Sequence, residues 1–156
     1  MQAAVATGVP GVTLIPLTNA RDDRGSLAAI ELSDLPFAPQ RVFAVYDVPD
    51  ESTRGSHAHR TCAQVLICLA GSLCCVVDDG RVREEVRLER ADTGLHVPPM
   101  IWATQWRYTA DAVLLVLASH PYDADDYIRD YDTYLSELAA TGARPAHPPD
   151  PPSDAP

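Results

Sequence analysis

Short apolar or alternating runs, each closed by a turn signal and spaced about ten residues apart, dominate this sequence. The turn chemistry is clearest at residues 78–80, where an Asp-Gly pair supplies the positive φ that a tight hairpin needs. Many short strands at this spacing are typical of a sandwich, a jelly roll or a barrel. We therefore predict an all-β fold, with strands near residues 12–17, 26–32, 41–48, 63–69, 73–77, 84–88, 95–97, 102–108 and 112–118.

One stretch near the C-terminus has helical periodicity instead. Within residues 124–140, large side chains recur at offsets of three and four, at Tyr127, Ile128, Tyr131, Tyr134 and Leu135. We expect one short C-terminal helix against the outside of the barrel. Six prolines follow Gly142, so residues 142–156 are predicted to be a disordered tail. Residues 1–11 are predicted to be a flexible segment, and residues 12–141 to form the single domain.

The chain is acidic and contains no lysine. Its 156 residues suffice for one domain with a proper core and are too few for two. A formal net charge of −10 disfavours nucleic acid or an anionic membrane as a partner, because the field of the protein repels phosphate. Without lysine no Schiff base can form on this chain, which excludes pyridoxal enzymes and lysine aldolases.

The cysteines favour a reducing compartment. Cys62, Cys68, Cys74 and Cys75 form no C-x-x-C pair, and the adjacent two would point to opposite faces of a strand. Residues 1–11 lack the basic start and the apolar run of a secretion signal. No apolar stretch approaches the roughly 18 residues that span a membrane. We expect a cytoplasmic protein with reduced, mostly buried cysteines and no membrane contact.

Two histidines carry the strongest functional signal. His57 and His59 stand at i and i+2, so on a strand both imidazoles point to one face and enter one cavity. Gln64 follows five residues later, and Gly71, seven residues further on, permits the next hairpin. This spacing resembles the first cupin motif, which has two His, a Glu and a Gly; here Gln64 holds the Glu position.

The second cupin motif, which places a third His after a Pro-containing turn, resembles residues 94–103. Ala103 holds the position of that third His. Two neutral imidazoles and an amide make a poor site for iron, manganese or zinc, which normally take three or four N, O or S donors. His96 is an alternative ligand, although its place two residues before Pro98 favours the barrel wall. We predict a cupin-type jelly-roll β-barrel that binds no metal and uses no cofactor.

Without a metal, two inward imidazoles are suited to moving protons, because their pKa lies near neutrality. A keto sugar needs this chemistry: a proton is taken next to the carbonyl, an enediol forms, and the proton returns at the neighbouring carbon. The alternative is that the pair merely fills a polar interior. The paired arrangement beside an arginine favours function.

Arginines supply a second signal. Arg24, Arg41 and Arg54 fall at strand starts or in loops that lead into the first half of the barrel. Because the planar guanidinium binds phosphate oxygens in pairs, we expect these residues to bind a nucleotide-linked substrate. Pairing with one of the many carboxylates is the alternative for each of them.

Together these stretches resemble the nucleotide-sugar 3,4-ketoisomerases, which are cupins that act on dTDP-4-keto-6-deoxyglucose. The resemblance runs from about residue 12 to residue 135. The matching segments are residues 23–27, 36–37, 41–43, 54–59, 71–72, 78–80, 94–95, 113–119, 122–123 and 126–132.

The resemblance implies a homodimer, a dTDP-linked keto-deoxysugar as ligand, no metal, and movement of the keto group from C4 to C3. His57 and His59 match the catalytic histidines of the family, and Arg24 and Arg54 match positions near the substrate. Tyr46 and Trp102 lie on matching strands and, with Arg41 and Gln64, complete the set of substrate-binding residues that we expect.

One position departs from the family pattern. The residue after Trp102 is usually His or Arg and helps to control the stereochemistry at the reprotonated carbon, whereas this chain has Ala103. The sequence therefore leaves the product epimer open, and an alignment shifted by a residue or two would bring Gln105 into the pocket instead. It also leaves open which histidine is the base, and what the final sugar is.

Two other functions remain as alternatives. A 3,5-epimerase-like enzyme would use a His base with a tyrosine acid on the opposite wall, for which Tyr46 and Tyr108 are candidates. An inactive nucleotide-sugar-binding module would bind the ligand without turnover, and the loss of a polar residue at Ala103 motivates this reading.

Overall fold

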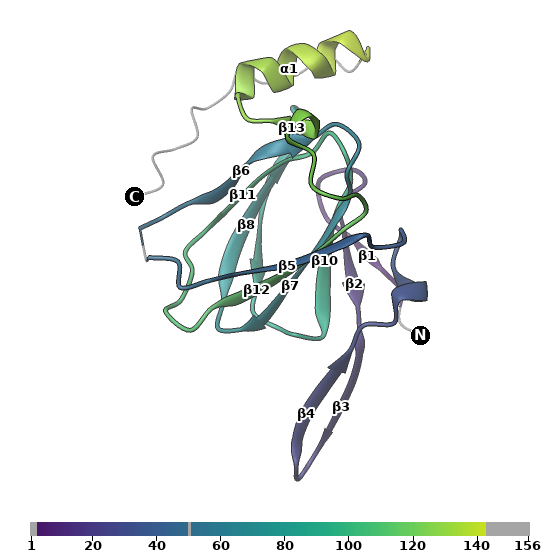
Figure 1. The fold of residues 1–156 in the computed structure, drawn as a ribbon, viewed down its shortest axis with the longest axis vertical. Coiled ribbons are helices and arrows are strands. Elements are labelled where there is room, and N and C mark those ends of the chain that lie inside the picture. The colour runs from purple at the N-terminus through teal and green to yellow at the C-terminus, as the bar shows by residue number, and fades with distance from the viewer. Residues whose placement is uncertain (1–2, 50, 143–156) are drawn as a thin grey trace.

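Two antiparallel sheets form the body of the protein in a computed structural model that describes residues 3–49 and 51–142 (Figure 1). The first sheet has the order β1 (Val5–Ala6), β2 (Thr13–Pro16), β10 (Thr93–Val97), β7 (Gln64–Ala70), β12 (Val113–Ala118) and β5 (Arg41–Tyr46). The second has the order β13 (Tyr127–Ile128), β6 (Arg54–His59), β11 (Trp102–Trp106), β8 (Leu73–Asp78) and β9 (Arg83–Leu88). A separate two-stranded hairpin, two short 3₁₀ turns, η1 (Leu32–Asp34) and η2 (Ala124–Asp126), and one helix, α1 (Tyr131–Ala140), complete the described elements.

The prediction of an all-β fold with one short C-terminal helix is confirmed. Each predicted strand appears with its ends shifted by no more than three residues. The structure adds strands β1, β13 and β3 (Thr18–Asp22), which the sequence pattern did not indicate, and it gives the His-x-His segment the full strand β6. Among the described residues, no helix has the length and apolar character needed to cross a membrane.

Alternation along the strands determines which side chains face the interior. On the edge strand β5, Arg41, Phe43 and Val45 are partly buried, whereas the intervening Val42 and Tyr46 are more than half exposed. The central strand β7 is apolar at successive positions, because both of its faces are covered. One face belongs to the core between the sheets, and the other packs against residues 30–37 outside the first sheet.

A hairpin stands apart from the barrel. Strands β3 and β4 (Gly25–Ala29) form their own two-stranded sheet, in which all residues but Ala29 are exposed. Figure 1 shows this hairpin extending away from the barrel, at the opposite end from α1. Its exposed Leu27 covers none of the cores of the chain.

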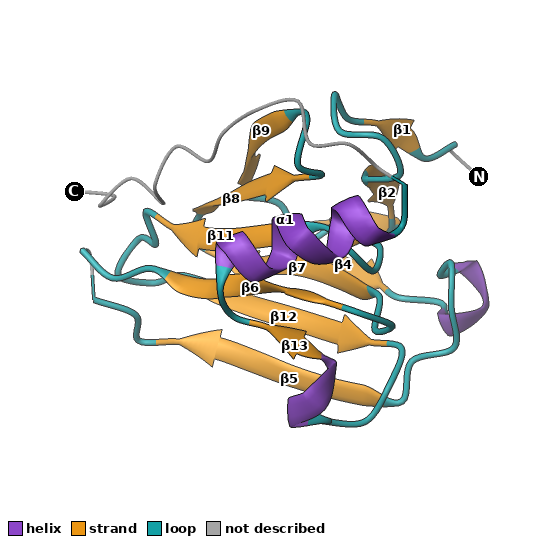
Figure 2. Ribbon diagram, turned by 90° about the horizontal axis from the view of Figure 1, so that it is seen from above, coloured by secondary structure: helices purple, strands orange, loops and turns teal. Residues whose placement is uncertain are grey.

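The C-terminal helix is shorter than the sequence predicts. The prediction of helix was wrong for residues 124–130, where η2 is followed by β13, which pairs with β6. The helix begins only after Asp130, whose side chain caps it by accepting a hydrogen bond from the Thr133 N–H. Figures 1 and 2 show α1 at one end of the barrel. The single hydroxyl hydrogen of Tyr134 is shared between the carbonyl oxygens of Asp78 and Met100, which lie 2.8 and 3.0 Å from the hydroxyl oxygen.

The domain begins earlier than residue 12. Strand β1 pairs with β2, and Val9 is fully buried in the main core, so part of the segment that we predicted as flexible packs with the barrel. The physical reason is that Val9 is buried in the core while Val5, whose side chain is exposed, contributes only strand pairing with Leu14, and this signal is too short to detect in the sequence. In the predicted tail, residues 143–156 lie outside the described residues.

Candidate active site

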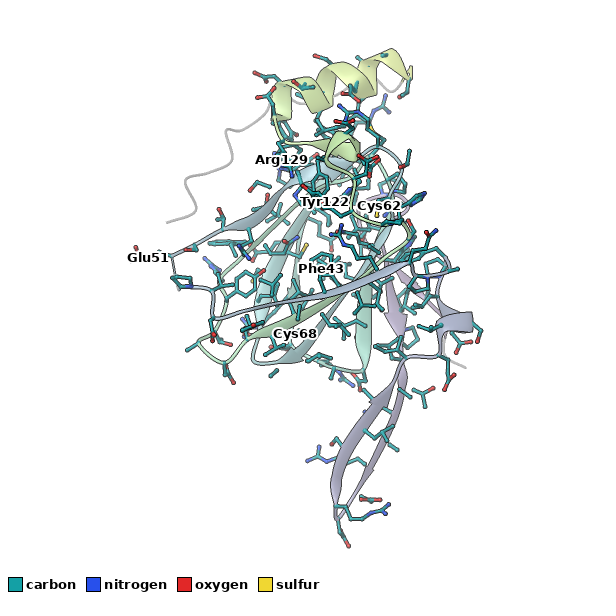
Figure 3. All side chains as sticks on the ribbon, in the orientation of Figure 1. Phe43, Glu51, Cys62, Cys68, Tyr122 and Arg129 are labelled. Atoms are coloured by element: carbon teal, nitrogen blue, oxygen red, sulfur yellow. The ribbon has the colours of Figure 1, made fainter. Side chains whose placement is uncertain are left out.

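A cavity of about 280 Å³ lies between the two sheets. Its apolar wall comes mainly from the first sheet and includes Phe43, Leu66, Leu114 and Val116. Figure 3 shows Phe43 in the interior of the barrel, and Tyr122 and Arg129 closer to the end that carries α1. The polar groups of the lining gather mainly on the second sheet and its edge: Arg41, Arg54, His57, His59, Gln64, Gln105, Tyr127 and Arg129.

His57 and His59 share this cavity, as their i and i+2 spacing predicts. They lie on β6 with their Nε2 atoms 3.1 Å apart and their rings nearly perpendicular. His59 is buried, and His57 is partly buried. Two imidazole nitrogens at this distance share one hydrogen, so one ring donates and the other accepts.

Asp126 contacts the ring nitrogen of His59 that faces away from His57. Its Oδ2 lies 3.0 Å from Nδ1 of His59, and both side chains are less than a tenth exposed. The carboxylate also accepts hydrogen bonds from the Thr61 N–H and hydroxyl, both at 2.7 Å, and from the Cys62 N–H at 3.2 Å. Burial raises the pKa of Asp126, but the hydrogen bonds from Thr61 and His59 outweigh it and leave this pKa below its usual value. Asp126 is therefore a carboxylate at neutral pH.

That charge assigns the hydrogens of both imidazoles. An ionised carboxylate only accepts, so Nδ1 of His59 carries the hydrogen and, in the neutral ring, Nε2 of His59 holds a lone pair. The Nε2 of His57 must then be the donor in the contact between the two rings. Asp126, His59 and His57 thus form one directed chain of hydrogen bonds that ends in the cavity.

Both histidines are neutral near pH 7. Burial, followed by the neighbouring His59 and by Arg129 and Arg41, lowers the pKa of His57 to about 4. Burial also lowers the pKa of His59, against the opposing effect of Asp126. A neutral imidazole with a free lone pair is the form that accepts a proton.

Only some of the other residues that we predicted to bind the substrate line the cavity. Arg41, Arg54 and Gln64 line the cavity with the histidines. Tyr46 is 63% exposed on the outer face of β5, and Trp102 packs against Tyr131 and Tyr134 beneath α1, so neither lines it.

Tyr46 and Trp102 lie outside the cavity because side chains alternate between the two faces of a strand. On β11 the inward positions are Ala103 and Gln105, which both line the cavity. The assignment of Tyr46 and Trp102 to substrate binding therefore has no geometric support in the cavity of their own chain. Arg24 lies on the β3–β4 hairpin with its side chain 90% exposed and paired with Asp22, far from the cavity lining.

Comparison with known proteins identifies the family to which this chain belongs. The sequence model of the family described as FdtA, WxcM-like, C-terminal, matches residues 10–139. The chain belongs to this family.

Relatives of known activity are consistent with this family. The TDP-4-oxo-6-deoxy-alpha-D-glucose-3,4-oxoisomerase of Aneurinibacillus thermoaerophilus is 43% identical over 76% of this chain and 86% of its own length. The crystal structure of QdtA, a sugar 3,4-ketoisomerase from Thermoanaerobacterium thermosaccharolyticum in complex with TDP, has a TM-score of 0.82 at 37% identity, over 85% of this chain and 98% of that one. The TDP-quinovose 3,4-ketoisomerase WlaRB of Campylobacter jejuni has a TM-score of 0.78 at 39% identity, over 82% and 99%. The resemblance to nucleotide-sugar 3,4-ketoisomerases is confirmed.

Within this ketoisomerase fold, sequence reasoning missed Asp126, Tyr127 and Arg129. All three lie on or next to β13, the strand that places Tyr127 opposite His59. The helical periodicity of residues 124–140 concealed this strand. The four residues from Asp126 to Arg129 show no alternation of polar and apolar types, since the two buried positions are Asp126 and Ile128, so the sequence pattern carried no clear strand signal there.

The donor set fits a proton site better than a metal site. In the described part of the chain, the group of three possible ligands closest to the cavity is His59, Cys62 and Asp126, whose donor atoms lie within 4.8 Å of one another. The two oxygens of Asp126 already accept four hydrogen bonds, which leaves this carboxylate poorly placed to bind a cation. Gln64 and Ala103, the two positions at which the sequence departs from the cupin motifs, both line the cavity and supply no usual metal donor there.

Proposed function

We propose that this protein is a sugar-nucleotide 3,4-ketoisomerase, which moves the keto group of a dTDP-4-keto-6-deoxyhexose from C4 to C3 through an enediol. The observation that carries the proposal is the buried chain Asp126, His59, His57, which ends in a cavity. Relatives named as TDP-sugar oxoisomerases or ketoisomerases support the same substrate class.

His59 is the base in this mechanism. Its Nε2 carries the lone pair, and Asp126 stabilises the imidazolium that forms when His59 takes the proton from C3. In the structure the N–H of His57 donates to this lone pair, and the proposed mechanism requires the sugar to take its place. Because one base serves both carbons, we expect the proton to return to C4 on the same face of the sugar from which it left C3.

The arginines of the cavity supply the anion site. Arg41, Arg54 and Arg129 line it, in a protein whose net charge is −10, so this is a local cationic region within an acidic surface. We propose that they bind the diphosphate of the nucleotide, and that the amide of Gln64 binds a sugar hydroxyl.

We further propose a homodimer in which Arg24 serves the cavity of the partner subunit. The β3–β4 hairpin covers nothing in its own chain, and its exposed Leu27 would be buried by a second copy. Mixing Arg24→Ala protein with His59→Asn protein tests this. After subunit exchange, an arginine that acts across the interface restores activity to about a quarter of the wild-type level, since half of the dimers then have one intact site. An arginine that acts within its own chain restores none.

Turnover of the 4-keto sugar nucleotide in deuterated water, followed by NMR, tests the main proposal. We expect a 3-keto product with deuterium at C4, and its loss in His59→Asn protein that still binds TDP. Deuterium at C5 would indicate a 3,5-epimerase-like enzyme instead. Tight binding of the nucleotide sugar without any turnover would indicate an inactive binding module.

Metal independence and a cytoplasmic location belong to the same proposal. The four cysteines are buried free thiols in the structure, which supports a reducing compartment. Activity that survives chelation and dialysis is the expected result, and a stoichiometric transition metal required for turnover would overturn the proton-transfer mechanism.

A further inference from the structure

Arg60 joins the strand that carries His59 to the segment that carries Asp126. It directly follows His59 at the end of β6, and its backbone N–H donates to the carbonyl oxygen of Asp126 at 2.9 Å. Nη1 of its side chain donates to the carbonyl oxygens of Asp125 and Tyr127, at 2.5 and 3.1 Å. The residue next to the base therefore binds the backbone of Asp126 and of both its neighbours.

We propose that Arg60 is a positioning residue of the isomerisation, which acts by holding the carboxylate of Asp126 against Nδ1 of His59. The inference rests on the proposed ketoisomerase function and adds to it a residue that touches neither the substrate nor the reacting atoms. Arg60 does not line the cavity, so its charge is not part of the proposed anion site. Its effect on the reaction passes through Asp126 and His59.

The segment that carries Asp126 has little regular structure of its own. Asp126 ends the 3₁₀ turn η2, and the strand β13 that follows has only two residues. Among the described strands, β13 pairs with β6 alone, at the end of the second sheet. The buried Ile128 anchors one face of β13 but lies two residues beyond Asp126. Because short elements at an edge open locally at low cost in free energy, contacts from side chains must hold Asp126 in place.

The contact between Asp126 and His59 tolerates little movement. Oδ2 lies 3.0 Å from Nδ1, the ordinary length of such a bond, and a hydrogen bond weakens steeply as its angle opens. The contacts of Nη1 with the two carbonyl oxygens are charge-assisted, which makes them roughly twice as strong as bonds between neutral groups. They restrain the backbone on both sides of Asp126 and so limit its rotation away from His59.

The rest of the guanidinium forms an ion pair with α1. Nε and Nη2 of Arg60 donate to the two carboxylate oxygens of Glu137, at 2.9 and 2.6 Å. The two side chains are 38% and 33% exposed, and ion pairs this accessible contribute little to stability. Because Nη1 alone makes both carbonyl contacts, the positioning of Asp126 and the docking of α1 use different atoms and can be separated by substitution.

Four variants separate these two roles. Arg60→Met keeps the aliphatic stem and removes every donor, so kcat should fall by about tenfold or more while the Kd for TDP stays within about threefold of wild type. Glu137→Ala removes only the ion pair and should keep kcat within about threefold of wild type. Arg60→Lys loses the fork but leaves one nitrogen to bridge the two carbonyl oxygens, so it should recover most of the kcat lost in Arg60→Met. Arg87→Met is the matched control, because Arg87 forms an exposed ion pair with Glu89 and does not line the cavity.

The tautomer of His59 gives a readout that the docking of α1 alone would not change. In protein with nitrogen-labelled histidine, NMR shows which ring nitrogen of His59 carries the hydrogen. Wild type, Glu137→Ala and Arg60→Lys should show only the form with hydrogen on Nδ1, whereas Arg60→Met should show a mixture of both tautomers. Arg60→Gln, whose side chain is shorter and uncharged, should behave as Arg60→Met does and replaces it if that protein does not fold.

Equal kcat in Arg60→Met and Glu137→Ala would overturn the proposal, and so would an unchanged tautomer of His59 in Arg60→Met. Either result would leave Arg60 as a residue that only docks α1. Equal losses of kcat and of TDP affinity would also overturn it, because Arg60 would then act on binding. Failure of the wild type to isomerise the sugar would instead reject the proposed function, and the tautomer measurement, which needs no substrate, would still decide the role of Arg60.

Discussion

Oδ2 of Asp126 lies 3.0 Å from Nδ1 of His59, across 67 positions of the sequence, and both side chains are buried. This contact decides which nitrogen of His59 carries hydrogen, and through it which atom faces the cavity as a base. The carboxylate is held in turn by Thr61 and by the Cys62 N–H, so its position is fixed by the turn that ends β6. Asp126, which orients His59, is therefore itself held by the backbone N–H groups of Thr61 and Cys62 and by the Thr61 hydroxyl.

Replacing Asp126 by asparagine should reduce kcat by about 100-fold or more, because an amide neither fixes the tautomer nor stabilises the imidazolium. The affinity for TDP should change little, since Asp126 does not line the cavity. Steady-state kinetics together with calorimetry of TDP binding measure both effects. Asp125→Asn is the control, because Asp125 is exposed. If both variants keep wild-type kcat, Asp126 does not orient the base.

The sequence allows the fold and part of the site to be predicted. The shared cavity of His57 and His59 follows from a strand period of two, which is local information, and the same period would have placed Ala103 and Gln105 inward and Trp102 outward. Asp126 could not be found this way. Its contact with His59 depends on β13, a strand of two residues whose pairing with β6 is a tertiary interaction that overrides helical periodicity.

Protonation of His57 should make stability depend on pH. Its pKa is about 4 in the folded protein, as a result of burial and of the charges near it, against 6.5 in an unfolded chain. Between these two pH values the unfolded state binds the additional proton, so the free energy of unfolding falls as the pH falls and is restored as the pH rises toward 6.5. One such group contributes at most about 1.4 kcal/mol per pH unit. Urea unfolding at about pH 7, 6 and 5 measures the slope, because the first value lies just above this window and the other two lie within it.

His57→Gln provides the comparison for that slope. Removing the titrating group should make the decline below pH 6.5 shallower, while the buried His59, whose pKa is also lowered, preserves part of it. A variant with the same pH dependence as the wild type would show that His57 titrates normally in the folded protein.

Gly55 should be intolerant of a side chain. It has a φ of +69° between Arg54 and His57 on β6, and a Cβ atom there would collide with the amide of the buried Gln105. Gly55→Ala should cost about 1–3 kcal/mol of unfolding free energy. Adding Gln105→Ala should recover only the part that comes from the collision, because the backbone strain remains. Full recovery in the double variant would mean that the left-handed conformation costs nothing.

Ala103 should determine how much room the sugar has beside the base. It is the register partner of His57 on β11 and lines the cavity, so a larger side chain there projects toward the reacting carbons. Ala103→Leu should lower kcat/KM by about tenfold or more, because displacing a substrate by about 1 Å from its reactive position is sufficient for losses of this size. Thr104→Leu is the matched control, since Thr104 does not line the cavity and its hydroxyl contacts Ser56 at the surface. Equal kinetics in the two variants, with equal melting temperatures, would place the sugar elsewhere in the barrel.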